Sequence, residues 1–128
     1  MMYELRYSRG AGTKSQIVNN PSFELIDYLI DELFPVINYY IVLSTDEKVD
    51  DCDCIQTVFR LVGEHDIEYQ VELLFKHEVG RSFYRKYTTD RSEVKGFFRL
   101  FLMEIIPDLK EWDNVTEEVE ATLHKRKK

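Results

Sequence analysis

The sequence predicts an α+β fold in which an antiparallel sheet of about five strands carries two main helices packed on one face. Three observations support this prediction. Several segments alternate apolar and polar side chains, which is the two-residue period of a half-buried strand. Two other segments repeat apolar residues every three or four positions, as amphipathic helices do. The turns between the central strands are too short for crossover connections, and this favours antiparallel pairing.

The chain of 128 residues fits a single domain, 1–128, with one hydrophobic core. Hydrophobic residues make up 44% of it, which is typical of a globular protein and not of a disordered one. It has no apolar run of about 18 residues that would predict a membrane span. The first residues lack the apolar segment of a signal peptide, so we expect a cytoplasmic protein.

The first strand is predicted at Tyr3, Leu5 and Tyr7, which alternate with polar residues. A helix should follow, with Asn20 as the N-cap and Pro21 at the first helical position. Proline cannot continue a helix, so this helix should end at Pro35. Its expected buried stripe consists of Ile26, Leu29, Ile30 and Leu33.

The central part of the chain predicts a set of neighbouring strands. Residues 39–43 form an apolar run, residues 44–53 read as an acidic loop, and residues 81–87 should form a last strand. Two alternating strands lie between them, with apolar residues at Ile55, Thr57, Phe59 and Leu61 and at Ile67, Tyr69, Val71, Leu73 and Phe75. The face turned away from the helices should carry Gln56, Arg60, Glu68, Gln70 and Glu72.

The second helix gives the clearest periodic signal. Asp90 is the expected N-cap and Glu93, three residues later, completes a capping box. Pro107 should end the helix, and Asn114 with Glu117 predicts a short terminal helix. The apolar stripe that should pack on the sheet consists of Val94, Phe97, Phe98, Phe101, Leu102 and Ile105.

Negative charge is concentrated between residues 24 and 53. This stretch holds nine acidic residues and one lysine, a net charge of −8, whereas the other 98 residues hold 15 acidic and 16 basic residues, a net charge of +1. Such a field attracts a basic partner and repels nucleic acid and anionic membranes, so we expect it to bind neither of these. An ordinary solvated loop and helix face would explain the same pattern. The acidic residues that we expect to contact a partner are Asp46, Glu47, Asp50, Asp51 and Asp53, with Glu24, Asp27 and Asp31 secondary.

The sequence contains no pattern that predicts catalysis. We find no nucleophile motif with a base and no set of metal ligands, because His65, His77 and His124 do not converge with Cys52 or Cys54. The two cysteines are interpreted as reduced structural thiols. We therefore expect a protein without catalytic residues, cofactor or metal.

A series of short motifs resembles a known family. Asn20-Pro21-Ser22 opens a helix, Val42-Leu43 and Ile55-Gln56 lie in strands, and Tyr69-Gln70-Val71-Glu72 follows. The series continues with Tyr87, Glu93-Val94, Phe98, Phe101-Leu102 and Trp112. Taken in this order, from about Asn20 to Val115, the motifs resemble small immunity proteins of bacterial polymorphic toxin and contact-dependent growth inhibition systems, which are often encoded beside deaminase-type toxins. The turn 62–66 has one glycine where many family members have more, and the insert 46–53 is longer than usual.

The resemblance implies a non-enzymatic inhibitor that binds the C-terminal domain of a cognate toxin in the cytoplasm. It would block the active site or substrate groove, and a nucleic-acid-targeting toxin would present a basic groove to an acidic inhibitor. Two other classes remain open: a small α+β ligand-binding domain or enzyme with a pocket between helices and sheet, and a regulator that mimics DNA.

Overall fold

The computed structural model describes residues 2–8, 14–32, 40–63 and 66–126. The fold is α+β, as predicted. Along the chain the elements are β1 (Tyr3–Ser8), β2 (Gln16–Asn19), α1 (Phe23–Asp31), β3 (Tyr40–Val49), β4 (Cys52–Val62), β5 (Asp66–Lys76), β6 (Arg81–Thr88), α2 (Arg91–Leu102), β7 (Asp113–Asn114) and α3 (Thr116–Arg126).

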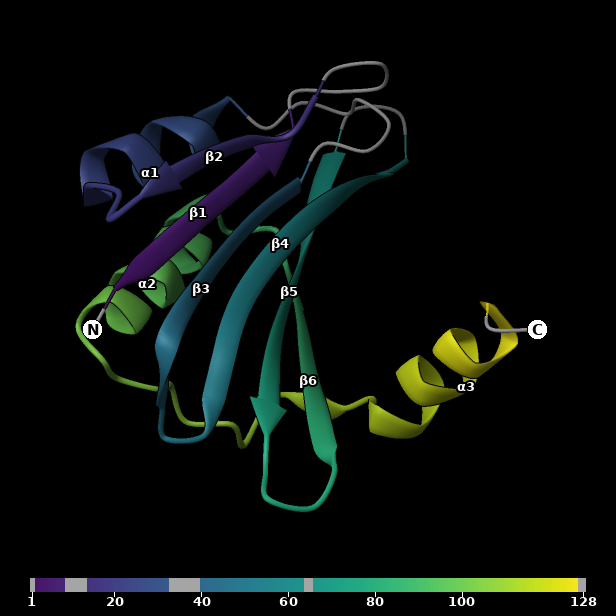
Figure 1. Cartoon of the computed structure of the whole chain (residues 1–128). Helices are drawn as coiled ribbons and strands as arrows, with labels where there is room; N and C mark the ends of the chain where they lie inside the picture. The colour runs from purple at the N-terminus through teal and green to yellow at the C-terminus, as the bar shows by residue number, and fades with distance from the viewer. Residues whose placement is uncertain (1, 9–13, 33–39, 64–65, 127–128) are drawn as a thin grey trace.

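The strands of the described residues form one antiparallel sheet of seven strands in the order β2-β1-β3-β4-β5-β6-β7 (Figure 1). The prediction of about five strands was therefore too low. The two additional strands are the edges of the sheet, and they contain only four and two residues. Segments this short do not contain enough residues for a two-residue period to be recognised.

Two helices cover one face of the sheet. Helices α1 and α2 run antiparallel, because Arg99 near the end of α2 lies over the ring of Phe23 at the start of α1, whereas Asp31 at the end of α1 pairs with Arg91 at the start of α2. The shared core is built from Leu5, Ile41, Leu43, Ile55, Val71 and Leu73 of the sheet, Ile26, Leu29 and Ile30 of α1, and Val94, Phe98 and Phe101 of α2. Phe97 and Leu102, which were predicted as core, are half-buried at its margin.

The third helix lies on the opposite face. Helix α3 is held by ion pairs from Glu118 to Arg85 and from Glu120 to Arg81, and both arginines belong to the face of β6 that points away from α1 and α2 (Figure 1). The predicted terminal helix is present, and Asn114 Oδ1 accepts a hydrogen bond of 3.0 Å from the amide of Thr116, its first residue.

The N-cap of the first helix differs from the predicted one. Helix α1 is capped by Ser22, whose Oγ accepts from the Leu25 amide at 3.2 Å, and not by Asn20. Asn20 instead accepts a hydrogen bond from the Tyr3 amide at 3.0 Å and donates its own amide to the Tyr3 carbonyl, so it closes the β1–β2 edge. The expected helix end at Leu33 and Pro35 lies outside the described residues.

Helix α2 begins at its predicted N-cap and ends earlier than predicted. Asp90 Oδ1 accepts from the Ser92 amide at 2.9 Å, but the amide of Asp90 itself donates to Thr88 Oγ1, so Glu93 does not complete a capping box. The helix stops at Leu102 because Glu104 takes a left-handed conformation (φ 61°). Its amide and that of Ile105 then bond back to carbonyls of the last turn, which is a Schellman motif. Ile105 is consequently exposed and not part of the core.

The segment predicted as an acidic loop is mostly strand. Strand β3 continues to Val49 and β4 begins at Cys52, so the connecting turn contains only Asp50 and Asp51. Thr45 and Val49 are both buried, with a register shift between Ser44 and Val49. The acidic side chains of this segment are therefore held on a hairpin and not on a long loop.

Candidate protein-binding surface

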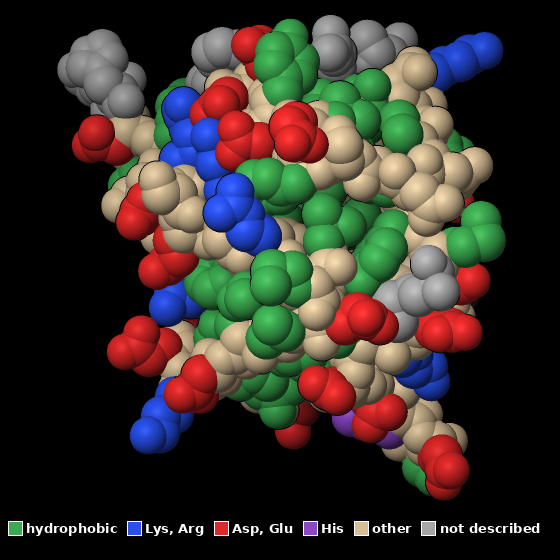
Figure 2. Space-filling view, turned by 90° about the vertical axis from the view of Figure 1, so that its left-hand side faces the viewer, with side chains coloured by type: hydrophobic (Ala, Val, Ile, Leu, Met, Phe, Trp, Pro, Cys, Tyr) green, Lys and Arg blue, Asp and Glu red, His purple; other side chains and the backbone are tan. Residues whose placement is uncertain are grey.

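Two β-hairpins meet at one end of the sheet. We use the name two-hairpin end for residues 46–53, which form the β3–β4 hairpin tip, together with residues 76–80, which form the β5–β6 tip (Figure 1). This end carries the acidic residues Asp46, Glu47, Asp50, Asp51, Asp53 and Glu78 and the basic residues Lys48 and Lys76. Six acids and two lysines give a net charge of −4 with histidine neutral. Figure 2 keeps this end at the bottom and shows acidic side chains along it.

The two tips are braced against each other. The Lys76 amide donates to the Asp51 carbonyl at 2.9 Å, and Lys48 Nζ donates to the Lys76 carbonyl at 3.1 Å. Two side-chain contacts add to this: Lys76 Nζ lies 3.3 Å from Asp53 Oδ2, and His77 Nδ1 lies 3.7 Å from Asp51 Oδ2. Because the backbone is already fixed, a partner that binds here has less chain to order, which lowers the entropic cost of association.

Several carboxylates of the two-hairpin end remain available to contact a partner. Glu47, Asp50 and Glu78 are exposed and form no ion pair with any described residue. Asp46 has a structural role, because its Oδ1 accepts from the Met2 amide at 2.7 Å and ties β1 to the end of β3. The structure thus brings together all five acids that were predicted here, and adds Glu78, which lies in a different hairpin.

The turn at Asp50 and Asp51 is conformationally unfavourable. Both residues have positive φ angles, 47° and 69°, and the strands pair directly on either side at Val49 and Cys52. Asn-Gly and Asp-Gly are favoured pairs for such a two-residue turn, so Asp50 suits its position. Asp51 occupies the position that usually holds glycine, where a non-glycine residue costs about 1–3 kcal/mol. Two adjacent aspartates also repel each other. A costly conformation that is retained is a recognised indication of a functional position.

The helix acids are placed differently. Asp27 and Asp31 of α1 face α2, where Lys95 Nζ lies 3.2 Å from Asp27 Oδ1 and 2.7 Å from Asp31 Oδ1. The hydrogen bond from Lys95 is the main cause that lowers the pKa of Asp31 below its ordinary value, and the charges of Lys95 and Arg91 add to it. These two carboxylates join α1 to α2 in the helix layer.

The predicted acidic field is therefore divided in space. Helix α1 lies in the helix layer, away from the two-hairpin end (Figure 1). Of its three candidate acids, Glu24 is the exposed one. The residue spacing in the sequence is consistent with the pairing of the α1 acids with α2. Arg91 and Lys95 are four residues apart on one helix, and Asp27 and Asp31 have the same spacing on the other, so the two pairs can face each other.

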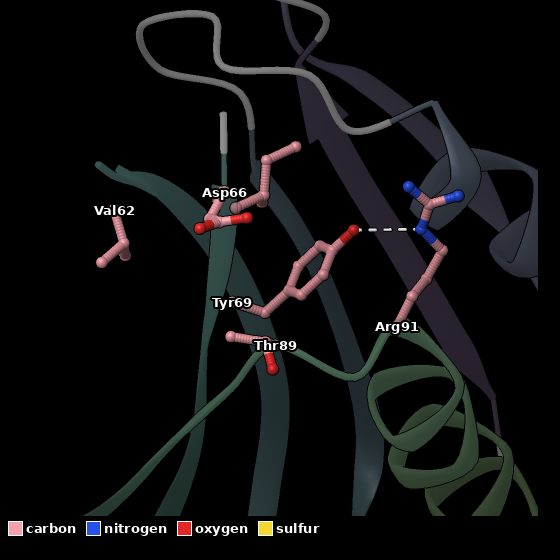
Figure 3. A pocket seen from close by; sticks show the side chains of 6 residues that line it. Val62, Asp66, Tyr69, Thr89 and Arg91 are labelled. Carbon is pink, nitrogen blue, oxygen red and sulfur yellow. Dashed lines mark hydrogen bonds between the residues drawn. The ribbon is translucent and has the colours of Figure 1, made fainter. Parts of the chain in front are cut away.

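A cavity of about 700 Å³ lies at the other end of the sheet, between the end of β4, the start of β5 and the start of α2. It is lined by Val62, Asp66, Ile67, Tyr69, Thr89 and Arg91. In Figure 3 the Tyr69 ring stands between Asp66 and Arg91. Arg91 Nε donates to the Tyr69 hydroxyl at 3.1 Å, and this contact raises the pKa of Arg91 above its ordinary value. The periodic pattern predicted Tyr69 as a core residue and could not indicate that its hydroxyl borders a cavity.

The sheet face that points away from α1 and α2 carries the predicted polar residues. At its centre is a buried carboxylate, Glu72, which accepts hydrogen bonds from Gln56 Nε2 and from Arg85 Nε, both at 2.9 Å. Desolvation alone would lower the pKa of Arg85, but its hydrogen bonds to Glu118 and Glu72 raise that pKa above the ordinary value. The charged groups of these side chains are paired with one another, so none of them is left as an unpaired charge that could act in catalysis.

The two cysteines are free thiols on opposite faces of the sheet. Cys52 belongs to the core, whereas Cys54 borders a small cavity of about 90 Å³ beside Gln56 and Glu72. Residues two apart in a regular strand share a face, so the bulge between Cys52 and Cys54 accounts for the separation. Burial is the main cause that raises the pKa of Cys52 to about 12 and that of Cys54 to about 11.

Within the described part of the chain, no group of three or more His, Cys, Asp or Glu side chains is placed to hold a metal ion. None of the helices in the same residues is long and apolar enough to cross a membrane. Comparisons of the chain with protein-family models, curated proteins and solved structures found no match.

Proposed function

We propose that this protein is an immunity protein that binds the C-terminal domain of a cognate bacterial toxin and blocks its active site or substrate groove. The observation that carries the proposal is the two-hairpin end, where Glu47, Asp50 and Glu78 remain unpaired on a braced scaffold. The motif series that resembles immunity proteins gives independent support. No catalytic step by the protein itself is part of this proposal.

The chemistry of the two-hairpin end suits a toxin that acts on nucleic acid. Such a toxin needs a cationic groove for phosphates, and carboxylates that reach into this groove compete with the substrate. A net charge of −4 on one end also steers the encounter, which can raise association rates about 10–1,000-fold at low salt. Rapid association favours an inhibitor that has to act before its toxin does.

The proposal is tested by binding kinetics with the toxin domain encoded beside the gene of this protein. A triple variant, Glu47→Gln/Asp50→Asn/Glu78→Gln, removes the unpaired charges and leaves the braces intact. We expect association to slow at least about tenfold at low salt, where the Debye length reaches about 30 Å at 0.01 M and these charges act over a long distance. The salt dependence should flatten, because the charges that physiological salt would screen have been removed.

A matched control removes the same amount of charge elsewhere. Glu32, Glu104 and Glu117 are exposed, so Glu32→Gln/Glu104→Gln/Glu117→Gln changes the net charge equally but leaves the two-hairpin end unchanged. Equal effects of the two triple variants would reduce the result to a net-charge effect and contradict this choice of surface. Failure of the wild-type protein to bind or inhibit the toxin domain would contradict the immunity function itself.

A second candidate function is a small-ligand-binding domain, and the cavity beside Tyr69 is the observation that favours it. Its volume of about 700 Å³ falls within the range of about 300–1,000 Å³ that is typical of ligand pockets. Arg91 and Asp66 offer a cation and an anion to a polar ligand. Native mass spectrometry of the purified protein tests this function: a bound small molecule that is lost in Tyr69→Ala would support it.

A further inference from the structure

One apolar side chain stands out on the two-hairpin end. Val79 is 92% exposed, far more than any other large apolar residue in the described part of the chain, where the next is Met103 at 59%. It lies at the tip of the β5–β6 hairpin, between Glu78 and Gly80. Gly80 provides the positive φ angle of 83° that the turn requires, and the His77 amide closes the turn by donating to the Gly80 carbonyl at 3.0 Å.

The fold itself gives no reason for a valine at this position. Turn tips favour Gly, Asn, Asp and Ser, which adopt turn conformations or satisfy the backbone, whereas β-branched residues favour strands. A side chain that is almost fully exposed also adds no burial to the core. A residue that contradicts local preference without a structural gain is an expected property of a functional position. The strained Asp50–Asp51 turn belongs to the same end of the molecule.

The turn that carries Val79 is supported by contacts of His77, two residues earlier in the chain. The His77 ring stacks on Phe75, with ring centroids 6.4 Å apart and planes 6° from parallel. Its Nε2 lies 2.9 Å from Ser82 Oγ across the hairpin, and its Nδ1 faces Asp51 of the neighbouring tip. Val79 is therefore presented on a supported turn, with unpaired carboxylates at Glu78 and Asp50.

We infer that Val79 is the apolar anchor of the two-hairpin end and inserts into an apolar recess in the basic surface of the toxin domain. This inference rests on the proposed function. It identifies Val79 as the residue that slows dissociation of the complex after electrostatic attraction has brought the two proteins into contact. Charge complementarity favours the toxin domain as the protein that binds this end, because a second copy of this chain would place acidic residues against acidic residues. A basic surface with an apolar recess matches both the carboxylates and the valine.

The two kinds of contact affect different rate constants. Exposed rim charges act mainly on association, whereas a buried apolar anchor acts mainly on dissociation. Full burial of a valine side chain corresponds to a change in affinity of about 10–100-fold. Val79→Ser should therefore raise the dissociation rate at least about tenfold and leave both the association rate and its salt dependence unchanged.

The experiment measures both rate constants against the toxin domain encoded beside the gene. Val62→Ser is the matched control, because Val62 is also an exposed valine but lies at the opposite end of the sheet. Val79→Ile should bind like wild type, and thermal unfolding of all three variants should match wild type, since neither valine is in the core.

The outcomes separate the inference from the function on which it rests. Wild-type dissociation in Val79→Ser, together with slower association in Glu47→Gln/Asp50→Asn/Glu78→Gln, would overturn the anchor and leave the immunity function standing. A wild-type protein that does not bind the toxin domain overturns both. Sedimentation of wild type as a dimer, with Val79→Ser a monomer, would overturn the toxin as occupant in favour of a second copy.

Discussion

Replacing Glu72 by alanine is expected to destabilise the protein by about 3 kcal/mol, near the lower end of the range for breaking a buried ion pair. Glu72 is 9% exposed, and its carboxylate accepts from Gln56 and Arg85. Without it, the Arg85 side chain, itself 14% exposed, keeps the exposed Glu118 as its one remaining ionic partner among the described residues. The lower end of the range is appropriate because Glu118 still compensates part of the arginine charge.

The neighbouring ion pair on the same face provides the control. Arg60 Nε donates to Glu68 Oε1 at 2.7 Å, but the Arg60 side chain is 59% exposed. Exposed pairs contribute about 0–1 kcal/mol, so Glu68→Ala should cost little. In urea, with an unfolding slope of about 2 kcal/mol per molar, Glu72→Ala should lower the denaturation midpoint by about 1.5 M and Glu68→Ala by less than about 0.5 M.

A double variant distinguishes the loss of attraction from the cost of an uncompensated charge. Glu72→Leu/Arg85→Met removes both charges and retains side-chain volume, and such replacements of buried pairs are often neutral. It should therefore be more stable than Glu72→Ala alone. Equal midpoint shifts in Glu72→Ala and Glu68→Ala would contradict the role of Glu72 in a buried ion pair, and so would a double variant that is the least stable of the three.

Three further outcomes are expected. Phe98→Ala should lower the free energy of unfolding by about 3–5 kcal/mol and the half-buried Phe97→Ala by clearly less, and equal losses in urea titrations would contradict the core assignment. The pKa of Asp31 is lowered in the folded state, so its contribution to stability is present above the ordinary carboxyl pKa of about 4 and is lost as the pH falls. In urea titrations between about pH 5 and 2, the free energy of unfolding should therefore decline less steeply in Asp31→Asn than in wild type. Iodoacetamide should label Cys52 and Cys54 slowly at pH 8 in the native protein and rapidly in urea, since their raised pKa values leave little thiolate; native labelling at the unfolded rate would contradict this.

Sequence periodicity was informative where an element was long and had one buried face. Strand β5 alternates over eleven residues, and every residue predicted for its polar face, including Glu68, Gln70 and Glu72, points away from α1 and α2. Helix α2 was predicted at its N-terminus because Asp90 has a side chain that caps it. Its end was not predicted, because the left-handed residue of the Schellman motif is Glu104 and not the glycine that usually marks such a position.

The candidate site was only partly predictable, because charge along a sequence does not determine charge in space. Asp27 and Asp31 belong to the acidic stretch of the sequence, yet the packing of α1 on α2 brings Lys95 within ion-pair distance of both. Glu78 lies outside that stretch, yet the pairing of β4 with β5 places its hairpin beside Asp50 and Asp51. Contacts between segments far apart in the sequence decide which carboxylates stay available.

This spatial redistribution of negative charge changes how a salt dependence of binding should be interpreted. The stretch 24–53 of the sequence has a net charge of −8 over 30 residues, whereas the two-hairpin end has a net charge of −4, a sum that already includes Lys48 and Lys76. A smaller net charge produces a weaker field, and at physiological salt screening limits its effect to charges within about 8 Å of the contact. Electrostatic steering by this end is therefore expected to be moderate. Tight inhibition would then depend on what the contact buries, and this makes the dissociation rate of Val79→Ser the measurement that discriminates best between a steering surface and a binding surface.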